Sequence, residues 1–474
     1  MSNEINNWLV ECLASCDFGD RRLTARAMKM GQCFSVKYGQ PFSIIFGGAS
    51  ELKRAYEFLA NPRTSFKKLT QAHHRQTAKE IGELPVLLSV GDTTFLDYDK
   101  ILVKRDEYGP IGSGGNGLIL HSSLAVHPDS GQPLGLLWEK LWKREPLAAP
   151  AKKETPKQKK KRLAAERKVK RKRPFPEKES YRWVEAFEEV QALFQELELT
   201  PSPKIVHVFD REGDISEVFE RVSQIQNTGI LVRAAHDRSL TGVYAHLWEY
   251  MEGQPIQLET TVELSSTKKR TGRMAQLAVR FCPVKLRAPS RLKNQDSFQV
   301  YAVYATEIHP PEGEDPVSWM LLTTELVTTE EEALQILRWY TYRWRVEDYH
   351  QILKSGCKAE SYRLRGSSME VLLGFLTGIA AQLFKLTYLN RTEPEAPATK
   401  VLRPVQLEVL KAQFRLKLPL PPTLTVAWAI QAVARLGGYL EHRKKTAIGI
   451  TVLWRGWLQL ESLCQGWELH AQLN

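Results

Sequence analysis

Two short apolar runs, each leading into an aspartate, limit most strongly how this chain can fold. Residues 84–90 precede Gly91 and Asp92, and residues 205–209 run directly into Asp210. Continuous apolar runs of this length are typical of strands that are buried on both faces of a largely parallel sheet. Because ligand sites in such sheets lie beyond the carboxyl ends of the strands, we expect both carboxylates at one sheet edge. The pattern predicts an α/β fold.

A third acidic residue, Glu347, lies in a segment that we predict to be one long helix, residues 330–356. At about 100° per residue, one narrow face of that helix would hold four side chains, those of Tyr340, Arg343, Glu347 and Lys354. A carboxylate beside arginine and lysine places a metal ligand next to cations that bind phosphate. The segment therefore favours phosphoryl transfer, although pairing of Glu347 with Arg343 on a helix surface would by itself be common and weak.

The candidate catalytic and metal-binding set consists of Asp92, Asp210 and Glu347. Oxygen ligands favour Mg²⁺, with Mn²⁺ as a substitute, over zinc. Two such ions about 3.5 to 4 Å apart can hold the attacking and leaving oxygens of a phosphodiester. We therefore predict two Mg²⁺ ions in a site that needs no side-chain nucleophile. Taken singly, Asp92 or Asp210 could instead cap a turn or a helix that follows its strand.

The rest of the chain predicts further strands at residues 121–126, 133–138 and 320–324, and helices at residues 181–198 and 212–222. Residues 229–319 are rich in Val, Thr, Tyr and Phe at short intervals, which indicates a β-rich insertion. Residues 1–75 show amphipathic helical spacing with interleaved basic residues, which suggests a small helical DNA-reading domain.

The positive charge is concentrated in one segment. Thirteen Lys or Arg and two Glu lie between Lys152 and Arg173, so this run carries +11 of the formal net charge of +12. Because it interrupts the apolar pattern, we expect a mobile insert at residues 150–176. The run could serve as a non-specific DNA tether or as a solvated linker.

The six cysteines are scattered and lack partners at metal-binding spacing, so neither a zinc site nor a disulfide framework is indicated. No signal peptide opens the chain, and residues 371–384 are too short an apolar run to cross a membrane. We expect a cytoplasmic protein with no membrane partner, in which residues 371–384 form a buried helix.

The spacing Tyr340-x2-Arg343-x3-Glu347-x6-Lys354 is similar to the Y-R-E-K motif of bacterial insertion-sequence transposases of the family numbered four. The resemblance extends over nearly the whole chain and includes the segments 19–26, 91–94, 210–212, 319–323, 434–438 and 453–457. It implies a metal-dependent transposase of the DDE type with an RNase H-like core, a mixed sheet flanked by helices. Asp92, Asp210 and Glu347 would be its metal ligands.

The resemblance also implies how the chain is divided and what it binds. Residues 1–75 would be a helical domain that binds transposon-end DNA, residues 76–385 the catalytic domain, and residues 386–474 a helical dimerisation domain. A homodimer would pair two ends, nick them, form and reopen DNA hairpins and join the ends to target DNA in the bacterial nucleoid. The DNA-binding side chains would be Tyr340, Arg343, Lys354, Trp319, Arg233, Arg21, Arg22, Arg26, Lys37, Lys53 and Arg54.

Other interpretations of these residues stay open at this point. Trp319 could be ordinary core, and the N-terminal basic residues could be a solvated helix face. The chain could also be a non-catalytic DNA-binding descendant, an RNase H-like nuclease that cuts without joining, or, more remotely, a glycoside hydrolase with paired carboxylates. Retention of all three acids argues against the descendant, and Arg343 and Lys354 fit poorly with a glycosidase.

Overall fold

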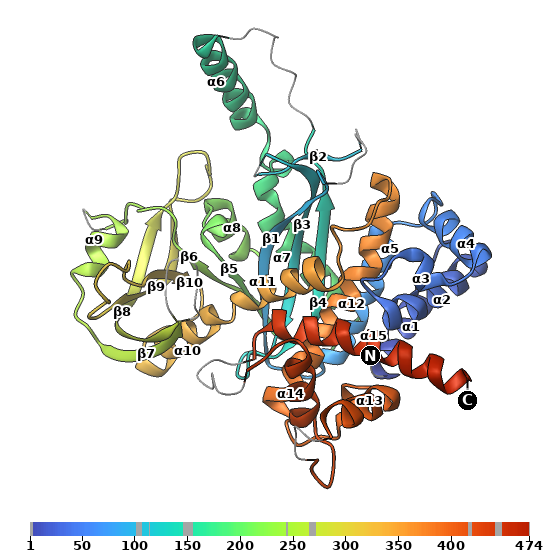
Figure 1. Cartoon of the computed structure of the whole chain (residues 1–474). Helices are drawn as coiled ribbons and strands as arrows, with labels where there is room; N and C mark the ends of the chain where they lie inside the picture. The colour runs from blue at the N-terminus through green and yellow to red at the C-terminus, as the bar shows by residue number, and fades with distance from the viewer. Residues whose placement is uncertain are drawn as a thin grey trace. The chain divides into compact units, whose positions relative to one another are not determined.

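The computed structural model describes residues 3–100, 107–112, 114–145, 155–242, 245–264, 272–415, 420–440 and 448–473. The chain divides into two compact units (Figure 1). One unit contains Met1–Gly82, Thr93–Pro146 and Arg345–Asn474, and the other contains Glu83–Asp92 and Leu147–Trp344. We call them the terminal unit and the central unit. The predicted domain boundaries at residues 75 and 385 stay predictions.

The central unit is built on a mixed sheet. Its strand order is β1–β5–β6–β10–β9–β8–β7, in which β1, β5 and β6 are parallel and the later neighbours are antiparallel. The strands are β1 (Val86–Asp97, whose residues from Thr93 on belong to the terminal unit), β5 (Lys204–Phe209), β6 (Thr228–Arg233), β7 (Leu258–Leu264), β8 (Arg273–Arg287), β9 (Ser297–Glu307) and β10 (Ser318–Thr323). β7, β8 and β9 confirm the predicted β-rich insertion.

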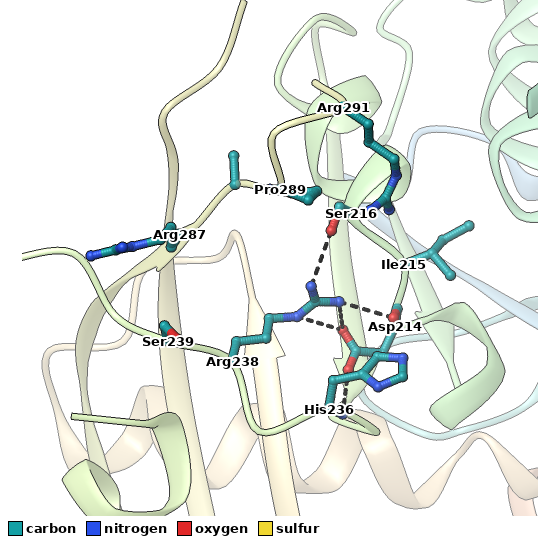
Figure 2. A pocket seen from close by; sticks show the side chains of 10 residues that line it. Asp214, Ile215, Ser216, His236, Arg238, Ser239, Arg287, Pro289 and Arg291 are labelled. Carbon is teal, nitrogen blue, oxygen red and sulfur yellow. Dashed lines mark hydrogen bonds and ion pairs between the residues drawn. The ribbon is translucent and has the colours of Figure 1, made fainter. Parts of the chain in front are cut away.

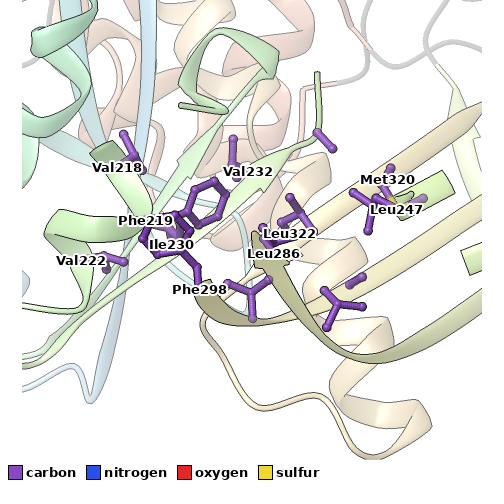
Figure 3. Packing of buried hydrophobic residues seen from close by; sticks show 14 of the residues in the cluster. Val218, Phe219, Val222, Ile230, Val232, Leu247, Leu286, Phe298, Met320 and Leu322 are labelled. Carbon is purple, nitrogen blue, oxygen red and sulfur yellow. The ribbon is translucent and has the colours of Figure 1, made fainter. Parts of the chain in front are cut away.

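Besides this sheet, the central unit contains helices. They are α6 (Pro156–Lys172), α7 (Arg182–Glu196), α8 (Ser216–Val222), α9 (Leu247–Glu252) and α10 (Glu330–Thr341), with short 3-10 turns η1 (Phe175–Glu177), η2 (Glu179–Tyr181) and η3 (Arg211–Gly213). Figure 3 shows side chains of α8 meeting those of the sheet, with Phe219 beside Ile230. The centroids of the Phe219 and Phe298 rings lie 5.8 Å apart. Burial of this apolar face holds the helices on the strands.

The terminal unit combines three strand segments with most of the helices. Its N-terminal helices are α1 (Asn3–Ala14), α2 (Arg21–Lys37), α3 (Phe42–Phe46), α4 (Ala49–Leu59) and α5 (Phe66–Ile81). Its strands are β2 (Gly109–Pro110), β3 (Asn116–Val126) and β4 (Pro133–Trp142), and β4 pairs antiparallel with β3. Its later helices are α11 (Trp344–Gln351), whose first residue belongs to the central unit, η4 (Ile352–Gly356), α12 (Gly366–Thr392), η5 (Ala398–Lys400), α13 (Pro404–Phe414), α14 (Val426–Leu436) and α15 (Ile450–Leu473).

Helix α12 forms the centre of the terminal unit. Two of its glycines allow α5 to approach closely: a Cβ at Gly378 would lie 2.4 Å from the His73 ring, and one at Gly374 would lie 2.9 Å from Leu69. Among the described residues, α12 is the one helix long and apolar enough to cross a membrane, but 89% of its apolar window is buried inside the protein. It is the buried helix that the apolar run 371–384 predicts, extended at both ends.

Three sequence-based expectations need correction. β1 does not end before Asp92 but continues to Asp97, because alternation of half-exposed and buried residues sustains a strand there. The predicted helix 330–356 is divided into three segments, α10, α11 and η4. At the end of α10 the N–H groups of Tyr342 and Arg343 donate to carbonyls three residues earlier, as in a 3-10 turn. At the end of η4 the N–H of Cys357 donates to the carbonyl of Ile352, five residues earlier. The common-face argument for residues 340–354 therefore fails. Finally, most of the basic insert is helical, in α6, where no helix was predicted; the mobility of the insert stays a prediction.

Candidate active site

Asp92 and Asp210 occupy matching positions on adjacent parallel strands of the central unit. Val90 on β1 is in register with Val208 on β5. Continuing that register by two residues sets Asp92 opposite Asp210, where β1 stops pairing with β5. Neighbouring strands lie about 4.8 Å apart, and in-register residues of parallel strands face the same side. Both side chains are partly exposed. The two strands thus place both carboxylates on one face of the sheet, just beyond the last paired residues of β1 and β5.

Arg182, the first residue of α7, lies within electrostatic range of both aspartates. Burial is the main influence and lowers the pKa of its guanidinium, whereas the charges of Glu212, Glu179, Asp210 and Asp92 act in the opposite direction. Its Nη2 donates to Glu212 Oε2 at 2.5 Å and its Nη1 donates to the Glu179 carbonyl at 2.9 Å. A fixed cation here offsets the mutual repulsion of the two aspartates.

The carboxylate of Asp210 has one oxygen engaged by the backbone. Oδ1 accepts from the N–H of Glu212 at 2.8 Å, so Asp210 caps η3. The capping interpretation considered from sequence is therefore correct for Asp210, and it is compatible with metal binding because a carboxylate has two oxygens and several acceptor positions.

Glycine on either side of the Phe209 ring permits the close packing behind the two aspartates. A Cβ added at Gly91 would lie 2.7 Å from Phe209 Cε1, and one at Gly213 would lie 2.6 Å from Phe209 Cβ. The Trp183 ring packs on Phe209 with centroids 4.6 Å apart. Buried aromatic packing thus fixes the backbone next to Asp92 and Asp210.

Arg233, Tyr340 and Trp319 form a second group in the central unit. The Arg233 side chain is hydrogen-bonded to that of Tyr340, and Arg233 Nη2 donates to the Ser318 carbonyl at 2.8 Å. The Trp319 ring meets the Tyr340 ring edge-on, with centroids 5.5 Å apart. Burial raises the pKa of Tyr340, and Asp210 is near enough to raise it further. The structure therefore brings these three predicted DNA-binding residues together and places Tyr340 near Asp210.

Arg343 belongs to the same neighbourhood. Its guanidinium lies 4.5 Å from the centre of the Trp344 ring, and its positive charge opposes the burial effect on the pKa of Tyr340. Arg343 is 6% exposed, whereas Trp344 is 48% exposed. The turn that ends α10 therefore directs the arginine inward and the indole outward.

Glu347 and Lys354 lie in the terminal unit, on α11 and η4. Glu347 is partly exposed. Lys354 pairs with Glu360 at 3.8 Å. Two residues after Glu347, the buried Tyr349 donates from its hydroxyl to Glu139 Oε1 at 3.0 Å. This buried bond holds α11 on β4 and thereby fixes the backbone that carries Glu347.

The chemistry of Asp92 and Asp210 suits a hard divalent cation, since both offer partly exposed carboxylate oxygens. Across the described ranges, no three His, Cys, Asp or Glu side chains form a group that could hold a metal ion. The assignment of Asp92, Asp210 and Glu347 as metal ligands therefore stays a prediction.

A pocket of about 350 Å³ lies beside the chain that follows Asp210 (Figure 2). Its wall contains Asp214, which is fully buried and accepts from the N–H groups of Ala235 and His236 at 2.7 and 3.0 Å. Arg238 donates to the same carboxylate through Nε at 3.2 Å and Nη2 at 2.5 Å, and to Ser216 Oγ through Nη1 at 3.0 Å. Asp214 thus joins the loop after β5 to the loop after β6.

Most N-terminal cations predicted to bind DNA take part in ion pairs of their own. Glu51 on α4 is the centre of one network, pairing with Arg26 at 2.7 Å, Lys29 at 3.0 Å and Arg54 at 3.3 Å. Hydrogen bonds from Arg26 and Lys29 lower the pKa of Glu51 to about 2. This network ties α2 to α4 and presents several cations on one side of the helices.

The remaining N-terminal candidates are more loosely held. Arg22 pairs with Asp20 at 3.2 Å but is 91% exposed, and Lys53 pairs weakly with Glu57 at 3.9 Å. Lys37 Nζ donates to the Ile44 carbonyl at 3.2 Å. Arg21 is exposed and makes no ion pair within the part of the chain that the structure describes. These side chains could turn to a phosphate at little cost, because exposed ion pairs are weak.

Sequence reasoning missed Arg182 and Asp214. Arg182 begins a helix that was predicted, but no local pattern signals that its guanidinium lies beside two strands. Asp214 follows Asp210 by four residues, and its partner Arg238 follows Arg233 by five. This spacing after the two predicted strands was the one available signal that their loops are joined.

Two parts of the chain match known families. Residues 140–383 match the family described as transposase DDE domain, and residues 5–64 match the family described as transposase DNA-binding. The first match covers more than half of the 474 residues, includes Asp210 and Glu347, and begins after Asp92. The second covers α2, α3 and α4 and most of α1. With the mixed sheet flanked by helices, the matches confirm the predicted RNase H-like fold class.

Proposed function

Since the chain belongs to the transposases with a DDE domain, we propose that it moves DNA by a cut-and-paste reaction at transposon ends, through a hairpin intermediate. The chain is a DNA-binding enzyme that cleaves DNA and transfers strands with the help of a divalent metal. The observation that best supports the finer proposal is the pair Asp92 and Asp210, with Arg182 beside it and the Arg233–Tyr340 pair near Asp210.

In this proposal Asp92, Asp210 and Glu347 are the metal ligands, and the metal is Mg²⁺, two ions per site, with Mn²⁺ able to replace it. When bound, the ions supply neutralisation of the charge that develops on the phosphodiester oxygens. Arg182 supplies a fixed positive charge beside the two aspartates. Tyr340 and Arg343 hold the DNA backbone beside the cut, and Lys354 does the same from η4.

Trp319 and Arg233 serve the hairpin in this proposal. Flipping a base out of a duplex costs a few kcal/mol, and stacking on an indole can return about 1 to 3 kcal/mol of that. Trp319 is half-buried against Tyr340, so one edge of the indole is fixed. Arg233 is fixed by Tyr340 and by the Ser318 carbonyl, and would brace the same strand.

We propose further that the transposase resembles that of transposon five in mechanism. Residues 1–75 bind the transposon end, residues 386–474 form a homodimer in the complex that pairs two ends, and the paired ends are joined to target DNA. The protein would work in the bacterial cytoplasm, associated with the nucleoid when bound to DNA.

The test is incubation of the full chain with paired candidate ends and Mg²⁺, Mn²⁺ or EDTA, followed by separation of nicked, hairpin and joined products. Glu347→Gln and Asp210→Asn should bind end DNA as the wild type does but give no cleavage. Asp237→Asn, at a half-exposed carboxylate of the central unit, is the matched control and should cleave normally. Full cleavage by Glu347→Gln would remove Glu347 from the ligand set, and nicking without joining would indicate a nuclease.

A further inference from the structure

Helix α6 carries its charge mainly on one face. At about 100° per residue, six of its basic positions fall within an arc of about 140°. All six side chains are exposed: Lys157, Lys160, Lys161, Arg167, Lys168 and Lys172. We call this set the basic stripe. Lys159 and Arg162 lie on the opposite side of the helix. A solvated linker has no need for such a distribution.

The basic stripe is unfavourable for the isolated helix. Lys157 and Lys161 are four residues apart, as are Lys168 and Lys172, and like charges at this spacing repel one another across a helical turn. In Figure 1, α6 stands clear of the other elements of its own unit. Val169 is 60% exposed, so no apolar face of α6 is covered at that position. A polyanion would relieve the repulsion, and the helix is about 26 Å long, enough to follow several phosphates of a duplex.

Chain connectivity places α6 close to the aspartate pair. The segment after α6 is anchored by Phe175 and Tyr181, whose rings meet edge-on at 5.6 Å and pack against the core of the central unit. Tyr181 also donates to Glu188 at 2.5 Å. The next residue is Arg182. Lys172 and Arg182 are ten positions apart in the chain, so even a fully extended connection between them spans at most about 35 Å.

That distance is about one helical turn of B-DNA. We propose that the basic stripe of α6 binds the phosphate backbone of double-stranded DNA without reading base sequence, with its Lys172 end within about one turn of the scissile phosphate. The inference rests on the proposed function for the position of the cut. Lysines and arginines that contact phosphate alone raise affinity for every sequence equally and make binding strongly dependent on salt.

The test compares two double variants of the full chain that each remove two positive charges. Lys161→Gln/Lys168→Gln alters the basic stripe, and Lys159→Gln/Arg162→Gln alters the opposite face. Glutamine is a good helix former, so the helix is retained in both. Binding of random-sequence duplex is measured from 50 to 200 mM salt. The stripe variant should have a slope of log affinity against log salt that is shallower by about 1.8, and the opposite-face variant should match the wild type.

Equal slopes for the two variants would overturn the proposal. So would a stripe variant that binds DNA as the wild type does but no longer binds vesicles of anionic phospholipid. The placement beside the cut is tested by repeating the measurement with transposon-end duplex, and shortening that duplex to about 15 base pairs on each side of the cut should leave the difference between the variants intact. If the difference disappears, α6 binds DNA farther away and its placement beside the cut is wrong. Absence of cleavage of paired ends by the wild type would refute the proposed function and leave the salt measurement valid.

Discussion

Asp214 and Arg238 form a buried ion pair that joins the loops following β5 and β6. The carboxylate is fully buried, and the guanidinium is 12% exposed. Asp210 precedes Asp214 by four residues, and Arg233 precedes Ala235, which donates to Asp214, by two. The pair therefore connects the segment that carries a proposed metal ligand with the segment that carries a proposed DNA contact.

Replacing Asp214 with alanine should lower the free energy of unfolding by about 3 to 5 kcal/mol, because Arg238 would stay buried without a counter-charge. Denaturant unfolding of the full chain, followed by tryptophan fluorescence, measures this loss. Glu217→Ala is the control, since it breaks the more exposed pair with Arg291 and should cost less than about 1 kcal/mol. Similar losses in both variants would show that the buried pair has no special role.

Tyr340→Phe should separate the two roles of Tyr340. The ring contact with Trp319 is kept, and the hydrogen bond with Arg233 is lost. A hydrogen bond to a charged group contributes about 1.5 to 3 kcal/mol, so hairpin formation should slow by about 10- to 150-fold if Arg233 braces the hairpin. Single-turnover kinetics with a pre-nicked end measures that step. An unchanged hairpin rate would mean that Tyr340 does not act through Arg233.

The strands that carry the site could be predicted because their signal is local. Residues 205–209 are apolar apart from His207, and the observed strand is Lys204–Phe209. The end of α10 at Thr341 could not be predicted, because no glycine or proline marks it. Arg182 could not be identified either, since its position beside Asp92 and Asp210 depends on how α7 packs on Phe209, a contact between residues far apart in sequence. Sequence patterns thus predict which strands carry the acids more reliably than which cations surround them.

Gly91→Ala should damage the active site while DNA binding by the N-terminal helices persists. The new methyl group would lie 2.7 Å from Phe209, which is already fully buried, so the ring or the β1 backbone must shift. Overpacking of this kind costs about 1 to 3 kcal/mol. The cleavage rate at saturating Mg²⁺ should fall with end-DNA affinity unchanged. Gly466→Ala on α15 is the control, because nothing lies within 4 Å of its added Cβ. Normal cleavage by Gly91→Ala would show that this packing does not position Asp92.

Glu51→Gln should loosen the N-terminal cations. Arg26, Lys29 and Arg54 would lose the carboxylate that orients them, and the surface would lose one negative charge. We expect tighter binding to random-sequence DNA, because added positive charge raises the affinity for every sequence. The ratio of the affinity for transposon-end DNA to the affinity for random DNA should fall, because sequence preference depends on how the cations are oriented. Competition binding at fixed salt measures the ratio. A ratio equal to that of the wild type would show that Glu51 does not organise recognition.

The buried histidines should make the free energy of unfolding fall as the pH drops below about 6.5, before the carboxylates begin to take up protons. Burial lowers the pKa of His207 from 6.5 to about 3. Above pH 6.5 the imidazole is neutral in both folded and unfolded chains, so its contribution to stability is complete. Between pH 6.5 and 3 only the unfolded chain takes up the proton, and the free energy of unfolding falls by about 1.4 kcal/mol per pH unit for each such histidine.

His73 and His350 behave in the same way, each with its pKa lowered by burial to about 3. His207 is the one to replace, because it lies in the central unit against the Phe187 ring, with centroids 4.4 Å apart, where an apolar side chain is compatible with the surroundings. His207→Leu should therefore show a shallower decline of unfolding free energy between pH 6.5 and pH 4 than the wild type. If the two pH profiles run parallel, the unfolded chain does not bind the extra proton at this position, and acid sensitivity must come from other groups.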